Sequence, residues 1–173
     1  NVIIENMLGD VEVELGVDFF ANREELEASA EKVVFTGMID QYFDYKHGEL
    51  EYRSLRFEHE VLDEENYQGN AVVNYTEREI PYTRIIEHKH FEYGTQDKTV
   101  ITREYPSDWK RGDEPYYPIN DERNNAIFAK YQEEATQNDK VIFCGRLADY
   151  KYYDMHVVIE RALDVVEEEL GSI

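Results

Sequence analysis

The stretch "VIFCGRLADYKYYDMH" (Val141–His156) joins a short apolar run to the start of a helix with an amphipathic pattern. An apolar run that ends in glycine just before a helix is typical of a buried strand in an α/β protein. A run of the same form, "KVVFTG" (Lys32–Gly37), lies near the other end of the chain. Two such strands predict one α/β unit whose halves are far apart in the sequence.

The sequence between these two runs has a different character, because apolar and polar residues alternate in short segments. These segments are "ELEYRSLRFEHEVL" (49–62), "GNAVVNYTE" (69–77), "YTRIIEHKHFE" (82–92) and "DKTVITREYP" (97–106). Short alternating strands separated by Gly, Asn and Asp predict an antiparallel sheet across about residues 50–105. The stretch "VEVELGVDF" (11–19) alternates in the same way and predicts a further strand.

Helices are expected on both sides of this sheet. Residues 1–8 predict a helix that ends at Gly9, Asn120 or Asp121 can cap a helix running to about Gln132, and a last helix is expected over 154–170. Residues 21–32 predict a loop or a short helical turn, and residues 107–121 an irregular connection. The apolar stripe of the last helix consists of Met155, Val158, Ile159, Ala162, Leu163, Val166 and Leu170.

The resulting fold class is a mixture of α+β and α/β, with an antiparallel sheet inserted into an α/β unit. We expect three segments, with boundaries at residues 1–45, 46–112 and 113–173. The chain has no initiator Met and begins in patterned sequence, so we expect a fragment of a longer protein.

The composition narrows the classes of partner and the compartment. The net charge is -21, from 39 acidic and 18 basic residues, so the chain repels phosphate backbones and nucleic-acid binding is not expected. Any anionic ligand must therefore be met by a local cluster of basic side chains. The single cysteine, Cys144, excludes an intrachain disulfide and fits a reducing compartment. No apolar run approaches the ~20 residues of a membrane span and no signal peptide is evident, so we expect a cytoplasmic protein.

The junction after the second strand can bind an anion. Ligands of open α/β sheets lie beyond the carboxyl ends of the strands, where Gly145 allows close approach and the helix starting at Asp154 favours negative charge. Arg146 and Lys151 add positive charge. Phenolic hydroxyls could donate to phosphate oxygens from Tyr150, Tyr152 and Tyr153. The alternative is that the two cations lie in a solvated loop and the tyrosines pack on the sheet.

The segment "YTRIIEHKHFE" is a second candidate. As a strand, it would place Arg84 and Ile86 on one face with His88 and His90. Two histidines in this spacing are weak evidence for a metal site, and no third ligand is in register, so no metal is assigned. A cationic face for a phosphate or a flavin is favoured, with a plain solvated sheet face as the alternative.

The segment "GDEPYYPIND" (112–121) is a third candidate. Tyr116 and Tyr117 lie between two prolines, which hold them rigidly. Such a pair can grip a ligand or form a packing corner, and the sequence leaves both open.

Five motifs together resemble the bacterial UDP-galactopyranose mutase family, in the order in which that family has them. They are "VVFTGMIDQYFDYKHGELEYRSLRFE" (33–58), "YTRIIEHKHF" (82–91), "TREYP" (102–106), "GDEPYYPIND" (112–121) and "GRLADYKYYDMH" (145–156). The resemblance implies an FAD enzyme that interconverts UDP-galactopyranose and UDP-galactofuranose, with N5 of the reduced flavin attacking the anomeric carbon. The carboxyl-terminal portion of such an enzyme would be present.

The resemblance also implies what each segment would do. Residues 46–112 would be the antiparallel substrate domain, inserted between two parts (1–45 and 113–173) of a Rossmann-like FAD domain. The glycines that grip the FAD pyrophosphate and the helical domain would belong to a missing amino-terminal half. The fragment alone is therefore expected to be inactive and to hold FAD weakly or not at all, and a homodimer is an expected form of the intact protein.

The family's functional residues map onto positions in these motifs. Catalytic roles fall on Arg84, Arg146 and Asp154. Binding of the substrate diphosphate falls on Arg84, Arg146, Tyr152 and Tyr117, with Tyr116 as the alternative to Tyr117. Contacts to the cofactor fall on Gly145, Arg146, Tyr153, Asp154, Met155 and His88.

Two other classes of protein remain open from the sequence. One is a flavoenzyme of amine-oxidase-like architecture, which would consume oxygen or nicotinamide in step with product. The other is an isolated binding domain without catalysis.

Overall fold

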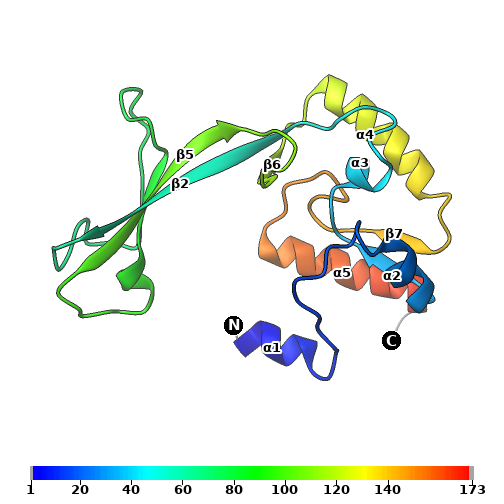
Figure 1. Cartoon of the computed structure of the whole chain (residues 1–173), viewed down its shortest axis with the longest axis horizontal. Helices are drawn as coiled ribbons and strands as arrows, with labels where there is room; N and C mark the ends of the chain where they lie inside the picture. Colours follow the sequence, from blue (N-terminus) through cyan, green and yellow to red (C-terminus); the bar gives the residue numbers. More distant parts are fainter. Residues whose placement is uncertain (1, 172–173) are drawn as a thin grey trace.

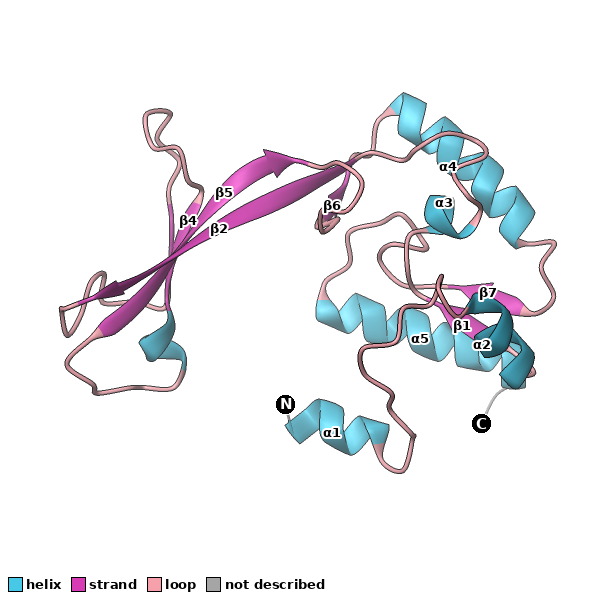
Figure 2. Ribbon diagram, in the orientation of Figure 1, coloured by secondary structure: helices cyan, strands magenta, loops and turns pink. Residues whose placement is uncertain are grey.

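The computed structural model describes residues 2–171 and contains helices and two sheets (Figures 1 and 2). The helices are α1 (Val2–Leu8), α2 (Arg23–Ser29), α3 (Ile39–Tyr42), the 3-10 helix η1 (His88–Phe91), α4 (Glu122–Ala135) and α5 (Met155–Leu170). The strands are β1 (Val33–Phe35), β2 (Tyr52–Leu62), β3 (Val72–Asn74), β4 (Arg84–Glu87), β5 (Thr99–Asp108), β6 (Tyr117–Pro118) and β7 (Val141–Phe143). The mixed α and β class predicted from the sequence is confirmed.

The two short strands near opposite ends of the chain, β1 and β7, pair with each other. β1 and β7 form a parallel pair in which Val33 lies opposite Val141 and Phe35 opposite Phe143. Phe35 and Val141 are buried with Tyr42 of α3 in one hydrophobic cluster. Parallel strands need a crossover between them, and here the crossover includes the whole antiparallel sheet. The predicted pair of strands at opposite ends of the sequence is therefore confirmed.

The larger sheet has five strands in the order β3-β4-β5-β2-β6, and all of its pairs are antiparallel. β2 and β5 pair from Arg53↔Asp108 to Leu62↔Thr99 and form a long twisted ribbon that projects from the part of the chain containing β1 and β7 (Figure 1). The predicted sheet across residues 50–105 is confirmed. The predicted irregular connection over 107–121 is only partly right, because β5 extends to Asp108 and β6 pairs with β2.

The strand predicted at residues 11–19 is wrong. This segment forms no strand and bends at Gly16, and Val11 and Leu15 remain 66% and 88% exposed. Alternation alone does not make a strand, because a strand needs a neighbour to satisfy its backbone groups.

The strand predicted over 82–92 is shorter than expected. β4 ends at Glu87, and the next residues turn in η1. The ammonium group of Lys89 donates to the carbonyl oxygens of Glu65 and Gln96, which ties this turn to both neighbouring loops. Strand alternation therefore does not extend to His88 and His90, so the prediction of a strand there is wrong. His88 still reaches the face of Arg84 and Ile86 through its contact with Thr102, whereas His90 pairs with Glu87.

The helices at the two ends differ in how they pack. Asp121 caps α4 by accepting a hydrogen bond from the Asn124 backbone N–H at 2.7 Å, as predicted. α5 also forms as predicted, yet its apolar stripe is largely uncovered, with Leu163 64% and Met155 77% exposed. α1 has no buried residue. No helix within residues 2–171 is long and apolar enough to cross a membrane.

Candidate functional site

A closed turn follows β7. Gly145 has a φ of +94°, which favours glycine, and its N–H donates to the Asp149 carboxylate at 3.1 Å. The Asp149 N–H donates back to the Gly145 carbonyl at 2.8 Å, and the Lys151 N–H donates to the Arg146 carbonyl at 3.0 Å. These bonds fix the turn, so Arg146 at its start and the residues after Lys151 are presented from a defined backbone.

Four of the predicted substrate-binding residues meet beside this turn, and we call Arg146, Tyr116, Tyr117 and Tyr152 the Arg146 cluster. The Arg146 guanidinium donates from Nη2 to the Tyr116 carbonyl at 2.7 Å and lies 4.9 Å from the centre of the Tyr152 ring. The centres of the Tyr117 and Tyr152 rings are 5.6 Å apart, and those of Tyr116 and Tyr117 are 6.4 Å apart. The cluster brings together residues from β6, its preceding loop and the segment before α5.

The Arg146 cluster has an unused donor. The Nε atom of Arg146 is buried and has no hydrogen-bond partner in the described part of the chain. An unsatisfied buried N–H of a charged group costs free energy, which an anionic ligand or a water molecule would offset. Tyr152 is 55% exposed, so the cluster lies at the surface of the chain. The arrangement is suited to binding an anion despite the net charge of -21.

The strand register shows which face of the large sheet carries Arg84. In the cross-strand row, Arg84 lies opposite Glu104, and Glu104 lies opposite Phe57. Residues opposite each other share a face, and the 3.7 Å ion pair between Arg84 and Glu104 agrees with this. The Phe57 ring lies 6.0 Å from the Tyr116 ring. Arg84 therefore lies on the face of the sheet where Phe57 contacts Tyr116 of the Arg146 cluster. It is two strands away from Phe57, and neighbouring strands are about 5 Å apart.

His88 lies on the same face of the large sheet as Arg84, because its partner Thr102 is opposite Ile86 in the strand register. It is the first residue of η1, at the end of the ribbon that points away from α5 (Figure 2), and its Nε2 pairs with the Thr102 hydroxyl at 2.7 Å. His90 instead pairs with Glu87, with 3.0 Å between Nε2 and Oε2. The two histidines therefore have separate partners. Within residues 2–171, no group of three or more His, Cys, Asp or Glu side chains is placed to hold a metal ion.

The three remaining cofactor candidates lie around the start of α5. Asp154 is the N-cap residue of α5, but its side chain makes no capping hydrogen bond and is exposed. Tyr153 is half-buried, and burial, followed by the nearby Asp149 carboxylate, raises the pKa of its hydroxyl. Met155 is 77% exposed. Asp154 and Met155 are therefore accessible, at the end of the segment that starts with Gly145 and Arg146.

Tyr150 follows the alternative left open by the sequence, in which the tyrosines pack and do not donate to a phosphate. Its side chain is only 1% exposed, and its hydroxyl lies 2.5 Å from the Glu51 carbonyl and 3.0 Å from the Ile119 carbonyl. The hydroxyl is therefore engaged with the backbone. No local sequence signal separates Tyr150 from Tyr152 and Tyr153, because all three lie in the same short segment and the partners of the Tyr150 hydroxyl are distant in sequence.

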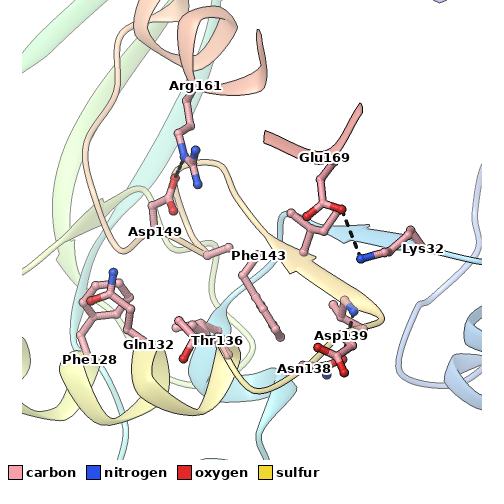
Figure 3. A pocket seen from close by; sticks show the side chains of 15 residues that line it. Lys32, Phe128, Gln132, Thr136, Asn138, Asp139, Phe143, Asp149, Arg161 and Glu169 are labelled. Atoms are coloured by element: carbon pink, nitrogen blue, oxygen red, sulfur yellow. Dashed lines mark hydrogen bonds and ion pairs between the residues drawn. The ribbon is translucent and has the colours of Figure 1, made fainter. Parts of the chain in front are cut away.

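A hollow of about 440 Å³ lies between α4, β7 and α5 (Figure 3). Both of its basic lining residues are paired with acidic ones, Lys32 with Glu169 at 3.2 Å and Arg161 with Asp149 at 3.6 Å, and Asp139 adds a further negative charge. Because these charges are paired, the hollow is less suited to an anion than the Arg146 cluster.

Comparison with known proteins supports the resemblance found in the motifs. The sequence profile of the UDP-galactopyranose mutase family matches residues 1–152. A dTDP-fucopyranose mutase of Escherichia coli is 36% identical over 171 residues, covering 95% of this chain and 45% of that protein. A probable UDP-galactopyranose mutase of Klebsiella pneumoniae is 38% identical over 165 residues (95% and 42%), and a UDP-galactopyranose mutase of Mycoplasma pneumoniae 38% over 144 residues (80% and 36%).

The chain spans less than half the length of each of these relatives, while they cover most of it. The family match includes β6, β7 and the Arg146 cluster and ends at Tyr152, before α5. The extent of this match and the identity of the relatives show that the chain belongs to the UDP-galactopyranose mutase family.

Proposed function

We propose that this chain is the carboxyl-terminal portion of a sugar-nucleotide mutase that interconverts UDP-galactopyranose and UDP-galactofuranose. The observation that carries the proposal is the Arg146 cluster, in which a cation and three tyrosines from separate segments meet at the carboxyl end of β7. A diphosphate is a group that such a set of donors recognises. The names of the relatives supply the reaction.

In this proposal, Arg146 and Arg84 offset the negative charge of the diphosphate. That charge grows when UDP leaves the sugar, so positioned cations lower the barrier to departure. Tyr152 and one of Tyr117 and Tyr116 donate phenolic hydrogen bonds to the phosphate oxygens. Asp154 is exposed at the start of α5, two positions after Tyr152, and would place a negative charge near the bound diphosphate.

FAD is the cofactor of the proposal. Gly145, Arg146, Tyr153, Asp154 and Met155 would contact it. The fit rests on the positive φ of Gly145, the unused Nε of Arg146 and the uncapped start of α5. When bound, the reduced flavin supplies the nucleophile for the anomeric carbon. The proposed contact of His88 with the flavin stays a prediction. His88 belongs to η1, and its Nε2 pairs with the Thr102 hydroxyl.

The segments 1–45 and 113–173 would form part of the FAD-binding domain, and 46–112 the substrate domain. The pairing of β1 with β7 supports the joining of the first and third segments. We further propose that the missing half of the protein is the natural partner of this chain, that the enzyme is cytoplasmic and that it can form a homodimer. The exposed apolar side chains of α5 support the missing partner.

A second substrate is favoured by one specific observation. The E. coli relative that covers 95% of the chain is named a dTDP-fucopyranose mutase. The corresponding candidate reaction is the same ring interconversion on dTDP-fucopyranose. Both substrates carry a diphosphate, so the Arg146 cluster would serve either.

The test is turnover of both sugar nucleotides by the full-length protein with reduced flavin, in the wild type and in Arg146→Ala. We expect turnover of at least one substrate and a loss of about 100-fold or more in kcat/KM for Arg146→Ala. The matched control is Arg123→Ala, which removes an exposed arginine of α4 that pairs with Glu51. Near-normal turnover in Arg146→Ala, or oxygen consumption in step with product, would contradict the proposal.

A further inference from the structure

Tyr150 connects three segments that carry or flank the candidate site. It lies in the turn between Arg146 and Tyr152. Its hydroxyl is 2.5 Å from the carbonyl of Glu51, which precedes β2, and 3.0 Å from the carbonyl of Ile119, which follows β6. The Ile119 N–H also points at this hydroxyl, at 3.2 Å.

These contacts satisfy the hydroxyl completely. Its single proton can go to either carbonyl, and its oxygen accepts from the Ile119 N–H. The Tyr150 ring is equally fixed, packing at 5.3 Å from the Tyr52 ring and 5.7 Å from the Phe128 ring. Tyr150 is only 1% exposed, so its side chain is not available for direct contact with a ligand that binds from solvent.

The backbone of Tyr150 is held in an unfavourable conformation. Its φ is +48°, a value that costs a residue with a side chain and persists where the surroundings enforce it. The turn that adopts this conformation directs Arg146 to the Tyr116 carbonyl on one side and places Tyr152 against Tyr117 on the other. Tyr116 and Tyr117 belong to the segment that the Tyr150 hydroxyl holds through Ile119.

We infer that Tyr150 is a positioning residue for diphosphate binding: its hydroxyl locks the turn that carries Arg146 and Tyr152 to the segment that carries Tyr116 and Tyr117. This inference rests on the proposed function. Without the hydroxyl, the Arg146–Tyr116 hydrogen bond and the contact of the Tyr117 and Tyr152 rings would still join the two sides of the cluster, but would hold them less rigidly. A diphosphate would then have to order them on binding, which weakens affinity.

The experiment compares two buried tyrosines in the full-length protein, with UDP as the probe. Tyr150→Phe removes the hydroxyl and keeps the ring. The matched control is Tyr131→Phe, because Tyr131 is also fully buried and its hydroxyl also bridges backbone groups, donating to the Gly48 carbonyl at 2.8 Å and accepting from the His47 N–H at 3.0 Å. Tyr131 lies outside the cluster, so Tyr131→Phe measures the general effect of losing such a hydroxyl.

We expect the Kd for UDP, measured by calorimetry, to rise roughly tenfold in Tyr150→Phe and to stay within about twofold of wild type in Tyr131→Phe, although both variants lower the Tm. If Tyr150→Phe does not fold, Phe128→Leu loosens the packing of the Tyr150 ring while keeping its hydroxyl, and a smaller rise in Kd is expected.

Equal Kd values for wild type and Tyr150→Phe, or equal rises in the two tyrosine variants, would overturn the positioning role alone. An unchanged Kd in Phe128→Leu would do the same where that variant replaces Tyr150→Phe. Wild-type protein that binds no UDP would overturn the proposed function, and this role with it.

Discussion

At the scale of single residues, Glu87 shows how the sheet fixes a buried charge. Its side chain is fully buried, and its carboxylate accepts hydrogen bonds from the backbone N–H groups of Tyr67 and Gln68 and from the Thr99 hydroxyl, at 2.8–3.0 Å. His90 lies 3.0 Å from its second oxygen. Burial opposes ionisation, but the hydrogen bonds outweigh it and lower the pKa of Glu87 to about 2.

This lowered pKa predicts how stability depends on pH. The pKa of Glu87 in the folded state lies below its ordinary value of 4.5, so its contribution to stability is present above about pH 4.5 and is lost as the pH falls towards 2. We expect Glu87→Gln to lower the free energy of unfolding by about 1–3 kcal/mol near neutral pH and by much less at about pH 3.

The measurement is urea unfolding of the chain at both pH values. Glu60→Gln is the control, because Glu60 lies in the same cross-strand row, on β2, and makes a partly exposed ion pair with Arg103. A loss for Glu87→Gln that is the same at both pH values would contradict the assignment.

At the scale of elements, the large sheet sorts its arginines by face. Arg84 shares a face with Glu104 and Phe57, whereas Arg103 lies opposite Glu58 and pairs with Glu60 on the other face. Only the first of these faces leads to Tyr116. Arg84 and Arg103 therefore lie on neighbouring strands but on opposite faces, and of these two Arg84 is on the face of the candidate site.

This sorting predicts different effects of two matched substitutions. In the full-length protein, Arg84→Ala should lower kcat/KM by roughly 100-fold, because it removes positive charge near the departing diphosphate. Arg103→Ala should leave kcat/KM within about threefold, since surface ion pairs contribute little. Steady-state kinetics on the UDP-sugar measures both, and losses of similar size would contradict the role of Arg84.

At the scale of the whole molecule, the chain shows surfaces that it does not cover itself. α5 leaves Met155, Ile159, Leu163 and Leu170 between 43% and 78% exposed. The small sheet has only two strands within residues 2–171, although parallel sheets are normally covered on both faces. A helix as short and unburied as α1 is not stable by itself in water. Each of these features agrees with a partner domain in the longer protein.

The α5 surface gives a prediction that depends on context. Leu163→Asp should change the Tm of this chain little, because Leu163 is 64% exposed here. In the full-length protein it should destabilise by about 2–4 kcal/mol, as expected for a charge placed in an apolar interface. Asp164→Ala, an exposed neighbour, should be near neutral in both. Equal effects of Leu163→Asp in the two contexts would show that the partner does not cover α5.

Flavin binding should depend on the same missing half. After incubation with excess FAD and gel filtration, we expect this chain to retain no flavin absorption, because the proposed function gives it only part of the contacts to the cofactor. The full-length protein should retain it. A flavin band that stays with the chain would contradict the expected division of the site between the two halves.

The sequence by itself determined the two buried strands, the antiparallel sheet, the capped helix α4 and the amphipathic helix α5. Each of these depends on periodicity or on local hydrogen bonds, which are properties of neighbouring residues. The motifs also determined the family, which the comparisons confirmed. The sequence further indicated that Arg146 and Tyr152 lie at a ligand-binding junction, although their role in binding stays a proposal.

Only the tertiary structure decided which residues meet. The contact of Arg146 with Tyr116 joins residues 30 positions apart, and that of Tyr150 with Glu51 joins residues 99 positions apart. The exposure of 11–17, the end of β4 at Glu87 and the burial of Tyr150 were also decided there. Whether an alternating segment becomes a strand, or a tyrosine faces a ligand or the core, depends on partners that are distant in sequence, and local pattern does not record them.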